Sequence, residues 1–282
     1  MIARALALIA PLSLAGCGAS VDAAMFGAWE SMLVAQGAMR VDPGDDIPFG
    51  PAELERDFRR VAFYSEFTGM PAAPDRHESP LTLIKWTGPV GWALAGDAAG
   101  PDDLAEMRAL IPRLAAATGL TFIQAAPGDA DIVVGIHSRA ARDAMPATMR
   151  GLGLDPRLPV PTGWLRNDRW PCMGVLALGG PAGPPKGAIY VRAEVSGLTR
   201  RSCLHEEVAQ MLGLPNDGDD VRPSIFNDDQ EFALLTRHDE ALLRILYDPR
   251  LRAGMTEAEG MPIVRAILED FDLSRPAPPK GQ

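Results

Sequence analysis

The segment 203–217, Cys-Leu-His-Glu-Glu-Val-Ala-Gln-Met-Leu-Gly-Leu-Pro-Asn-Asp, constrains the fold more than any other part of the chain. Its apolar residues recur at helical spacing, while Glu206 and Gln210, four residues apart, share the opposite face. Gly213 ends the helix and turns the chain, which brings Asn216 back near the helix end. We therefore expect a helix that is buried along one stripe: Leu204, Val208, Met211 and Leu212.

Helices and strands are both predicted along the rest of the chain. Apolar residues at helical spacing predict helices over about 23–38, 51–67, 102–118, 201–212 and 256–270, with another that begins at Thr236. Alternating or apolar runs predict strands over 81–86, 120–124, 130–137, 173–178 and 188–191. We expect irregular structure over 140–170, which contains several prolines. Because the strands precede a helical C-terminal part, the order of elements predicts an α+β fold.

The composition fits a soluble protein with one domain of about 200–250 residues, or two smaller ones. The chain has 282 residues, of which 47% are hydrophobic and 23% charged. The 27 basic and 37 acidic residues give a formal charge of −10. Nucleic-acid binding draws on clustered Lys and Arg, so this balance argues against a nucleic-acid partner.

The N-terminal residues have the features of a secretory signal. Arg4 is followed by an apolar run over residues 5–15, which is too short to span a bilayer as a permanent helix. Leu14-Ala15-Gly16-Cys17 resembles a bacterial lipobox, in which the cysteine becomes the first mature residue and carries the lipid. An ordinary signal peptide with a chance cysteine is the alternative. By the same resemblance, Gly18 in place of Asp favours the outer membrane.

We therefore expect four parts along the chain. They are a lipoprotein signal peptide at 1–16, a lipidated tether with N-terminal helices at 17–80, the main domain at 81–273 and a disordered tail at 274–282. Since no second apolar run is long enough to span a membrane, the lipid on Cys17 is the expected attachment to the cell envelope, on the periplasmic face.

Two cysteines remain, Cys172 and Cys203. In an oxidising periplasm such a pair most simply forms a disulfide. Two unpaired buried thiols are the alternative.

The helix within 203–217 resembles the zinc site of metzincin-type metallopeptidases, whose pattern is His-Glu-x-x-His-x-x-Gly-x-x-His/Asp. On this chain the catalytic base of that family falls on Glu207, the turn on Gly213, and the three metal-ligand positions on Glu206, Gln210 and Asn216. The resemblance implies a zincin-like α+β fold. Its mixed sheet of four to five strands would pack on a long helix and on the helix that carries Glu207.

Flanking segments extend this resemblance over residues 81–247. Residues 130–133 resemble the strand that those peptidases lay beside the substrate, and residues 118–122 resemble the segment before it. Phe226 stands where their Met-turn has methionine, and residues 235–247 resemble their closing helix.

The metal-ligand positions depart from the metzincin pattern, because none of them is histidine. Zinc favours His nitrogen and Cys sulfur, and an amide oxygen is a poor ligand for it. An all-oxygen set would suit calcium better. The acidic loop at 216–220 lacks the spacing of an EF-hand. We therefore expect no cofactor, with zinc or calcium as the less favoured options.

Histidines elsewhere do not restore the pattern. His205 lies about 100° around the helix from Glu206, so it cannot share a metal with Gln210. His137 ends a predicted strand and is the one other candidate to approach the cleft.

A structural reading of Glu206 and Glu207 is ion pairing with nearby arginines. The candidates are Arg200, Arg201 and Arg222.

The pattern Cys-Leu-x-Glu-Glu-x-x-Gln-x-Leu-Gly-Leu-x-Asn-Asp also resembles an uncharacterised family of secreted proteins, the domain of unknown function 2927. That name implies no activity. We expect a lipid-anchored envelope protein whose degenerate metzincin-like domain binds a peptide or another envelope component without zinc hydrolysis. The alternatives are an active metal-dependent hydrolase that uses Glu206, Gln210 and Asn216, or His137, and a purely structural lipoprotein.

Overall fold

The computed structural model describes residues 21–65, 79–151, 169–177 and 185–272. The expected signal peptide, Cys17 and the expected tail at 274–282 lie outside these ranges. Among the described helices, none combines the length and the apolar character needed to cross a membrane.

A five-stranded mixed sheet forms the centre of the fold, and the expected α+β class is confirmed. Its strands, in spatial order, are β4 (Phe122–Gln124), β3 (Val90–Ala95), β5 (Ile132–His137), β7 (Lys186–Arg192) and β6 (Cys172–Ala177). The first four are parallel to their neighbours, whereas β6 runs antiparallel to β7 at one edge. A separate two-stranded sheet pairs β1 (Tyr64–Ser65) with β2 (Ser79–Pro80).

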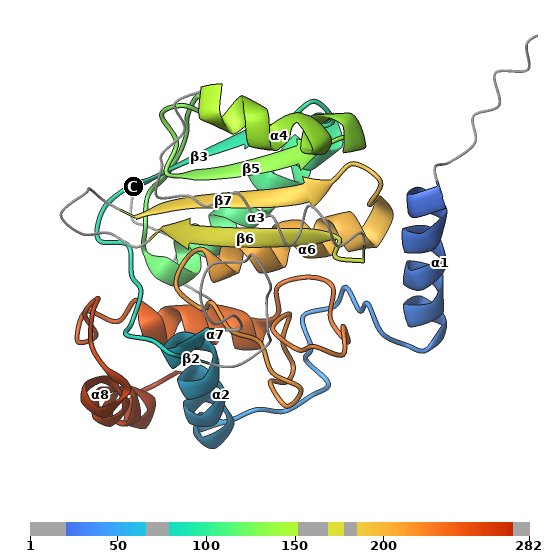
Figure 1. Ribbon diagram of the computed structural model, residues 1–282. Coiled ribbons are helices and arrows are strands. Elements are labelled where there is room, and N and C mark those ends of the chain that lie inside the picture. Colours follow the sequence, from blue (N-terminus) through green and yellow to red (C-terminus); the bar gives the residue numbers. More distant parts are fainter. Residues whose placement is uncertain (1–20, 66–78, 152–168, 178–184, 273–282) are drawn as a thin grey trace, which may run out of the picture.

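Helices cover both faces of the sheet (Figure 1). α4 (Arg139–Gly151) lies on one face, and α3 (Pro101–Thr118) and α6 (Gly197–Gln210) lie on the other. A further layer packs beyond α3, with α7 against α3 and α2 against α7 and α8. Its bounds are α2 (Pro51–Phe63), α7 (Arg237–Leu246) and α8 (Glu257–Glu269). α1 (Val21–Ala35) stands at the side of the molecule, beside the start of α6.

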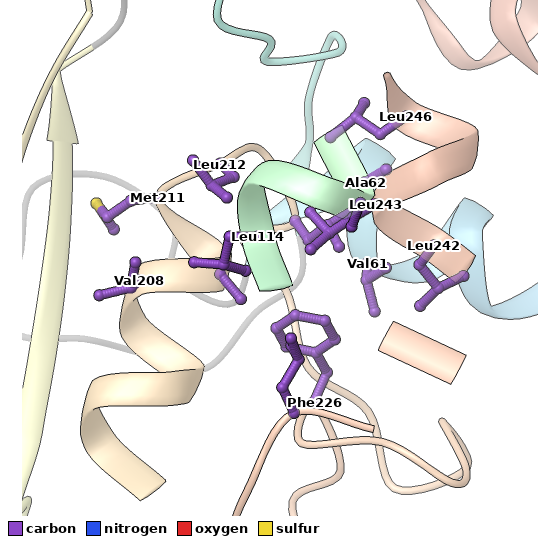
Figure 2. Packing of buried hydrophobic residues seen from close by; sticks show 14 of the residues in the cluster. Val61, Ala62, Leu114, Val208, Met211, Leu212, Phe226, Leu242, Leu243 and Leu246 are labelled. Carbon is purple, nitrogen blue, oxygen red and sulfur yellow. The ribbon is translucent and has the colours of Figure 1, made fainter. Parts of the chain in front are cut away.

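One large hydrophobic cluster joins the sheet to α2, α3, α6, α7 and α8 (Figure 2). The predicted stripe of α6 is part of it, because Leu204, Val208, Met211 and Leu212 are all at most 4% exposed. α2 is equally buried in this cluster through Leu54, so the second helix belongs to the same core as the sheet.

Residues 81–86 do not form the strand that their alternation predicts. Their backbone is held instead by the loop before α8, where Leu83 N–H donates to Met255 O (2.8 Å) and Leu83 O accepts from Gly254 N–H (2.8 Å). The first strand of the sheet is β3, which the sequence pattern does not predict. Gly91 within it makes its pattern weak, since glycine lowers strand propensity.

The prediction of irregular structure over 140–170 is wrong for its first part, which is helical in α4. Ser138 caps this helix, because its Oγ accepts a hydrogen bond from Ala141 N–H (3.2 Å). Arg142 then anchors the first turn through an ion pair with Glu194 (2.7 Å), with the Arg142 side chain only 3% exposed.

Gly213 ends α6 where the chain passes very close to the 81–86 segment. Its φ is +111°, and a Cβ placed on it would lie 2.1 Å from Ile84 O. The carbonyl groups just before it are bound by side chains, because Trp86 Nε1–H donates to Met211 O (2.8 Å) and Tyr247 O–H donates to Leu212 O (2.9 Å). Both the backbone conformation and the close approach therefore require glycine here.

We expect Gly213→Ala to lower the free energy of unfolding by roughly 3 kcal/mol, from the left-handed backbone and the clash together. Gly119→Ala is the matched control, because Gly119 also has a positive φ (+72°) but has open space around it. That control should lose only about 1 kcal/mol. Urea unfolding of both variants measures the difference, and equal losses would contradict this explanation.

The Cys172–Cys203 disulfide links β6 to α6 across 31 residues of sequence. In the chain-entropy model, a disulfide that closes a loop of this size stabilises the folded state by about 3–4 kcal/mol. We expect the double variant Cys172→Ala/Cys203→Ala to lose about that much in urea unfolding. Dithiothreitol should destabilise the parent protein similarly and leave the variant unchanged. Parent and variant midpoints that coincide under oxidising conditions would refute this contribution.

Candidate functional site

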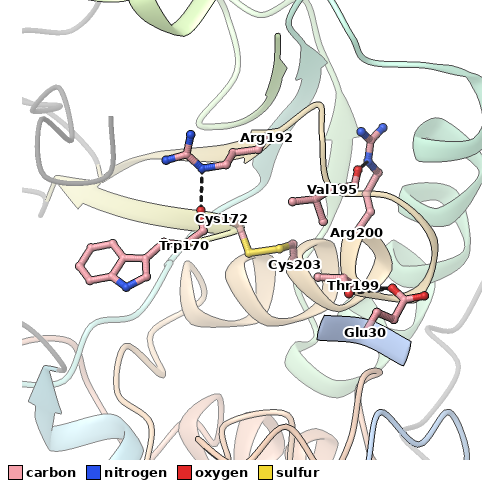
Figure 3. The surroundings of a disulfide bond; sticks show 8 residues. All are labelled: Glu30, Trp170, Cys172, Arg192, Val195, Thr199, Arg200 and Cys203. Atoms are coloured by element: carbon pink, nitrogen blue, oxygen red, sulfur yellow. Dashed lines mark hydrogen bonds between the residues drawn. A yellow bond between two sulfur atoms is a disulfide. The ribbon is translucent and has the colours of Figure 1, made fainter. Parts of the chain in front are cut away.

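The N-terminus of α6, the helix that carries Glu207, is held by a side chain from α1. Ser196 at the cap position makes no side-chain cap. Instead, Glu30 accepts hydrogen bonds from Thr199 N–H and Thr199 Oγ1–H, both at 2.7 Å (Figure 3). This carboxylate is favourable there because the free amide groups of a helix N-terminus carry partial positive charge.

One face of α6 presses against β6. Cys203, Glu207 and Met211 follow one another at intervals of four residues and point to the same side. Cys203 forms the expected disulfide with Cys172 of β6 (Figure 3). One turn after Cys203 comes Glu207, and one turn after that comes Met211. Both lie against Gly174, which is two residues after Cys172 and therefore faces the same side of the sheet.

Glu207 lies behind β6, with only 7% of its surface exposed. A Cβ placed on Gly174 would be 2.5 Å from Glu207 Oε2 and 2.6 Å from the Met211 methyl carbon. A glycine at this position is therefore required for the helix and its carboxylate to approach the strand so closely.

The outer edge of β6 carries backbone groups that do not pair with β7. Arg192 N–H donates to Pro171 O (3.1 Å), so residues 171, 173, 175 and 177 form the hydrogen-bonded pairs of the antiparallel ladder. The backbone N–H and C=O groups of Cys172, Gly174 and Leu176 therefore point away from β7. Within the described ranges, β6 has a neighbouring strand on one side only.

The three ligand positions of the metzincin resemblance differ in their surroundings. Gln210 and Asn216 are buried, whereas Glu206 is half-buried. Gln210 Nε2–H donates to Asp217 Oδ1 (2.9 Å), which confirms that the turn after Gly213 returns to the end of the helix. Asn216 Nδ2–H donates to the backbone oxygen of Arg60 in α2 (3.1 Å). Both amides thus tie the end of α6 to its surroundings.

These positions do not fit a zinc ion. The Gln210 and Asn216 side chains offer at most amide oxygens, which zinc binds poorly. In the described part of the chain, no group of three His, Cys, Asp or Glu residues is arranged to hold a metal. Two carboxylates of the acidic loop at 216–220 have partners within the protein. Asp217 accepts a hydrogen bond from Gln210, and Asp220 lies 3.3 Å from the guanidinium group of Arg60.

Phe226, at the Met-turn position, is fully buried in the same hydrophobic cluster as Leu114 of α3 and Val208 of α6 (Figure 2). Its carbonyl oxygen accepts from Gly218 N–H (2.9 Å), and its own N–H donates to Ser224 Oγ (2.9 Å). Ser224 in turn donates to Asp239 of α7 (2.5 Å). These hydrogen bonds connect the turn to α7 and hold Phe226 in the hydrophobic cluster.

The arginines considered as partners of Glu206 and Glu207 form ion pairs with other carboxylates. Arg200 and Arg201 contact α3, and Arg222 contacts the loop before α7. Their partners are Asp103, Glu106 and Glu231, respectively.

Two expectations about the surroundings of Glu207 are wrong. β5, which begins at the third residue of 130–133, is the central strand between β3 and β7 and offers no edge to a substrate, whereas β6 lies at an edge of the described sheet. His137 lies beside Tyr190, with 6.3 Å between ring centroids, and Tyr190 packs with Met145 of α4. His137 is therefore on the opposite face of the sheet from Glu207.

Sequence reasoning did not identify Gly174, Arg60 or Glu30 as part of this region. A glycine inside a strand is a signal for close approach of another element, so Gly174 could have been found. Arg60 and Glu30 have no local signal, because each acts on a segment more than 150 residues away.

His205 is a buried structural histidine. Leu235 N–H donates to its Nδ1 (3.0 Å), and its Nε2 lies 2.8 Å from Glu106 Oε1. Since Nδ1 accepts, the proton of the neutral ring is on Nε2. Burial lowers the pKa of His205, and the hydrogen bond to Glu106 offsets this only in part.

We expect His205 to stay neutral at pH values somewhat below 6.5, the ordinary pKa of histidine. Between that value and its lower folded pKa only the unfolded chain takes up the proton, so the stability contributed by neutral His205 is lost as the pH falls. Two-dimensional ¹H–¹⁵N spectra of the imidazole groups measure the titration and the tautomer.

His238 is the internal comparison for this titration. Burial opposes its protonation, but the carboxylate of Asp239, 3.9 Å from Nδ1, and the hydrogen bond between Nε2 and Asp57 (3.0 Å) outweigh burial and raise the pKa of His238. The two histidines should therefore titrate on opposite sides of 6.5. A midpoint for His205 at or above that of His238 would contradict the assignment.

Comparison with known proteins identifies the family and no activity. No curated protein matches the chain at a significant level. A family model described as "Protein of unknown function (DUF2927)" matches residues 51–266, which is most of the chain. The match runs from the start of α2 into α8 and includes the whole 203–217 segment. The chain therefore belongs to the DUF2927 family, as that segment predicts.

Proposed function

We propose that this protein is a lipid-anchored protein of the cell envelope that binds an extended peptide segment along the outer edge of β6, without zinc-dependent hydrolysis. One observation carries the proposal, namely the row of outward backbone groups on Cys172, Gly174 and Leu176, beside the helix that carries Glu207. The peptide would belong to another envelope component.

The edge of β6 supports strand addition for a physical reason. An exposed edge offers N–H and C=O groups that a peptide backbone can pair with, and side-chain pockets then supply selectivity. β6 is also held rigidly, because the disulfide fixes Cys172 to α6 and β7 pairs along its whole length. A rigid edge loses little conformational entropy when the peptide binds.

The two sides of β6 would present different surfaces to the peptide. Towards α6 lie the disulfide, Gly174 and Leu176, whereas Met173 and Val175 face the cluster under α4. Alternate side chains of a bound strand point to opposite faces. We therefore expect selectivity among peptides to come mainly from apolar contacts with their side chains.

Lipid anchoring is the second part of the proposal. Arg4, the apolar run over 5–15 and the Leu14–Cys17 lipobox support it, and Gly18 favours the outer membrane. The Cys172–Cys203 disulfide agrees with an oxidising compartment.

The zincin-like resemblance fits a binding role better than metal hydrolysis. Gln210 and Asn216 donate hydrogen bonds that hold the end of α6, and Glu207 is buried behind Gly174. This helix keeps the Glu207 and Gly213 positions of the metzincin pattern while lacking the nitrogen ligands that zinc requires.

Peptide binding can be tested with a variant that removes one outward N–H. Peptides are selected from a random displayed library against the full chain in detergent, and their affinities are measured by fluorescence anisotropy. Leu176→Pro removes the outward N–H of residue 176 without breaking the ladder to β7. We expect it to weaken binding by about tenfold or more, which corresponds to the loss of roughly one net hydrogen bond.

Leu176→Ala is the matched control, because it removes the same side chain and keeps the N–H. It should retain affinity within about threefold of the parent if backbone pairing dominates. Equal losses in the two variants, or a library that yields no binding peptide, would refute strand addition at β6.

The hydrolase alternative is separated from binding by metal analysis of the purified protein. We expect substoichiometric zinc and intact selected peptides after prolonged incubation. Stoichiometric zinc, together with peptide cleavage that Glu207→Gln abolishes, would establish the alternative and overturn the proposed function.

A further inference from the structure

We propose that the outer face of α1 lies against the lipid bilayer and sets the orientation of the protein on the membrane. This inference rests on the lipid anchor at Cys17 that forms part of the proposed function. It adds a second, non-covalent contact between the folded chain and the lipid.

The two faces of α1 differ in what they contact. Its inner face packs on the body of the protein through Phe26 and Leu33, which are 4% and 8% exposed. The opposite half of the helix is exposed, and Met25 and Met32 are 40% and 48% exposed there. The exposed residues of this outer face are Ala24, Met25, Gly27, Ala28, Ser31, Met32, Val34 and Ala35.

The charges of α1 point inward, which reverses the usual pattern of a surface helix. Asp22 pairs with Arg139 of α4 (2.8 Å), and Glu30 binds the N-terminus of α6 at Thr199. These are the only charged residues of the helix, so its outer face carries no charge. A helix facing only water would gain nothing from this arrangement, whereas burial against lipid stabilises exposed apolar side chains.

The position of α1 in the chain identifies the bilayer as the surface that it contacts. Val21, its first residue, follows Cys17 by only four positions. Four residues span at most about 14 Å when fully extended, so a lipid on Cys17 holds the start of α1 within that distance of the membrane surface. The uncharged face is thus on the part of the protein that the anchor places next to lipid.

The contact can be measured with an environment-sensitive fluorophore (NBD) on single cysteines. The chain has three cysteines, one of which is the proposed lipidation site while two form the disulfide, so an introduced cysteine can be labelled selectively. We would label Met25→Cys and Met32→Cys in the full chain, reconstituted on phosphatidylethanolamine–phosphatidylglycerol vesicles with a nitroxide quencher in the lipid. Ile123→Cys is the matched control, an apolar residue 53% exposed on the edge strand β4.

We expect lipid-borne nitroxide to quench the labels at 25 and 32 roughly threefold more than the label at 123, with a blue shift only at the first two. Equal, weak quenching at all three positions in protein that floats with the vesicles would overturn this inference and leave the lipid anchor intact. A blue shift without quenching, with a dimer in sedimentation, would assign the face to a second copy instead and also overturn it. Parent protein that fails to float and lacks the lipid mass at its N-terminus would refute the anchor, and this inference with it.

Discussion

The close packing of α6 on β6 is the contact on which the candidate site depends. The side chains between a helix and a sheet normally set the distance between them. Here two glycines on neighbouring strands allow the helix to approach more closely. Gly174 of β6 lies against Glu207 and Met211, and a Cβ on Gly187 of β7 would be 2.9 Å from Met211 Sδ. The disulfide joins the same two elements one turn earlier. Together these contacts fix where the carboxylate of Glu207 lies relative to the edge strand.

Polar side chains at the other end of α6 hold the helix in the same position. Gln210 binds Asp217, and Asn216 binds the backbone of α2. Trp86 and Tyr247 bind the two carbonyl groups that directly follow the helix. Buried polar groups of this kind are stable only when each finds a partner, so they specify one arrangement of the surrounding segments. Two of the three positions that would carry metal ligands in the metzincin pattern, Gln210 and Asn216, therefore serve here to connect α6 with the loop after Gly213 and with α2.

The parts of the fold that sequence reasoning predicts correctly are those with a strong local signal. The stripe of α6, the glycine that ends it and the helix start at Thr236 are all local, and the structure contains each of them. β3 and α4 are not predicted from the sequence, because their local signals are weak. A glycine weakens the strand pattern of β3, and Pro146 falls within α4, whose first turn is fixed by an ion pair to distant Glu194. Residues 81–86 alternate like a strand, but Leu83, Ile84 and Trp86 are all buried, and the backbone hydrogen bonds of Leu83 go to the loop before α8.

In the candidate site, too, local patterns predict some features and not others. Cys172 and Cys203 could be paired from chemistry alone, and the return of the chain near Gln210 follows from the glycine turn. Which face of the sheet His137 occupies, and which strand forms the edge, depends on the order of strands in space. That order is set by tertiary packing between segments far apart in sequence, so local patterns carry no information about it.

The hydrogen bonds from Glu30 to the start of α6 have a consequence for how the folded unit is delimited. The family match begins at residue 51, yet α6 within that match is capped at its N-terminus by the carboxylate of Glu30, which lies before the match begins. A fragment cut at the family boundary would leave the amide of Thr199 to water and would expose the surface that Phe26 and Leu33 now cover. In this chain, α1 therefore packs as part of the folded unit that contains the family match, through the hydrogen bonds of Glu30 and the contacts of Phe26 and Leu33.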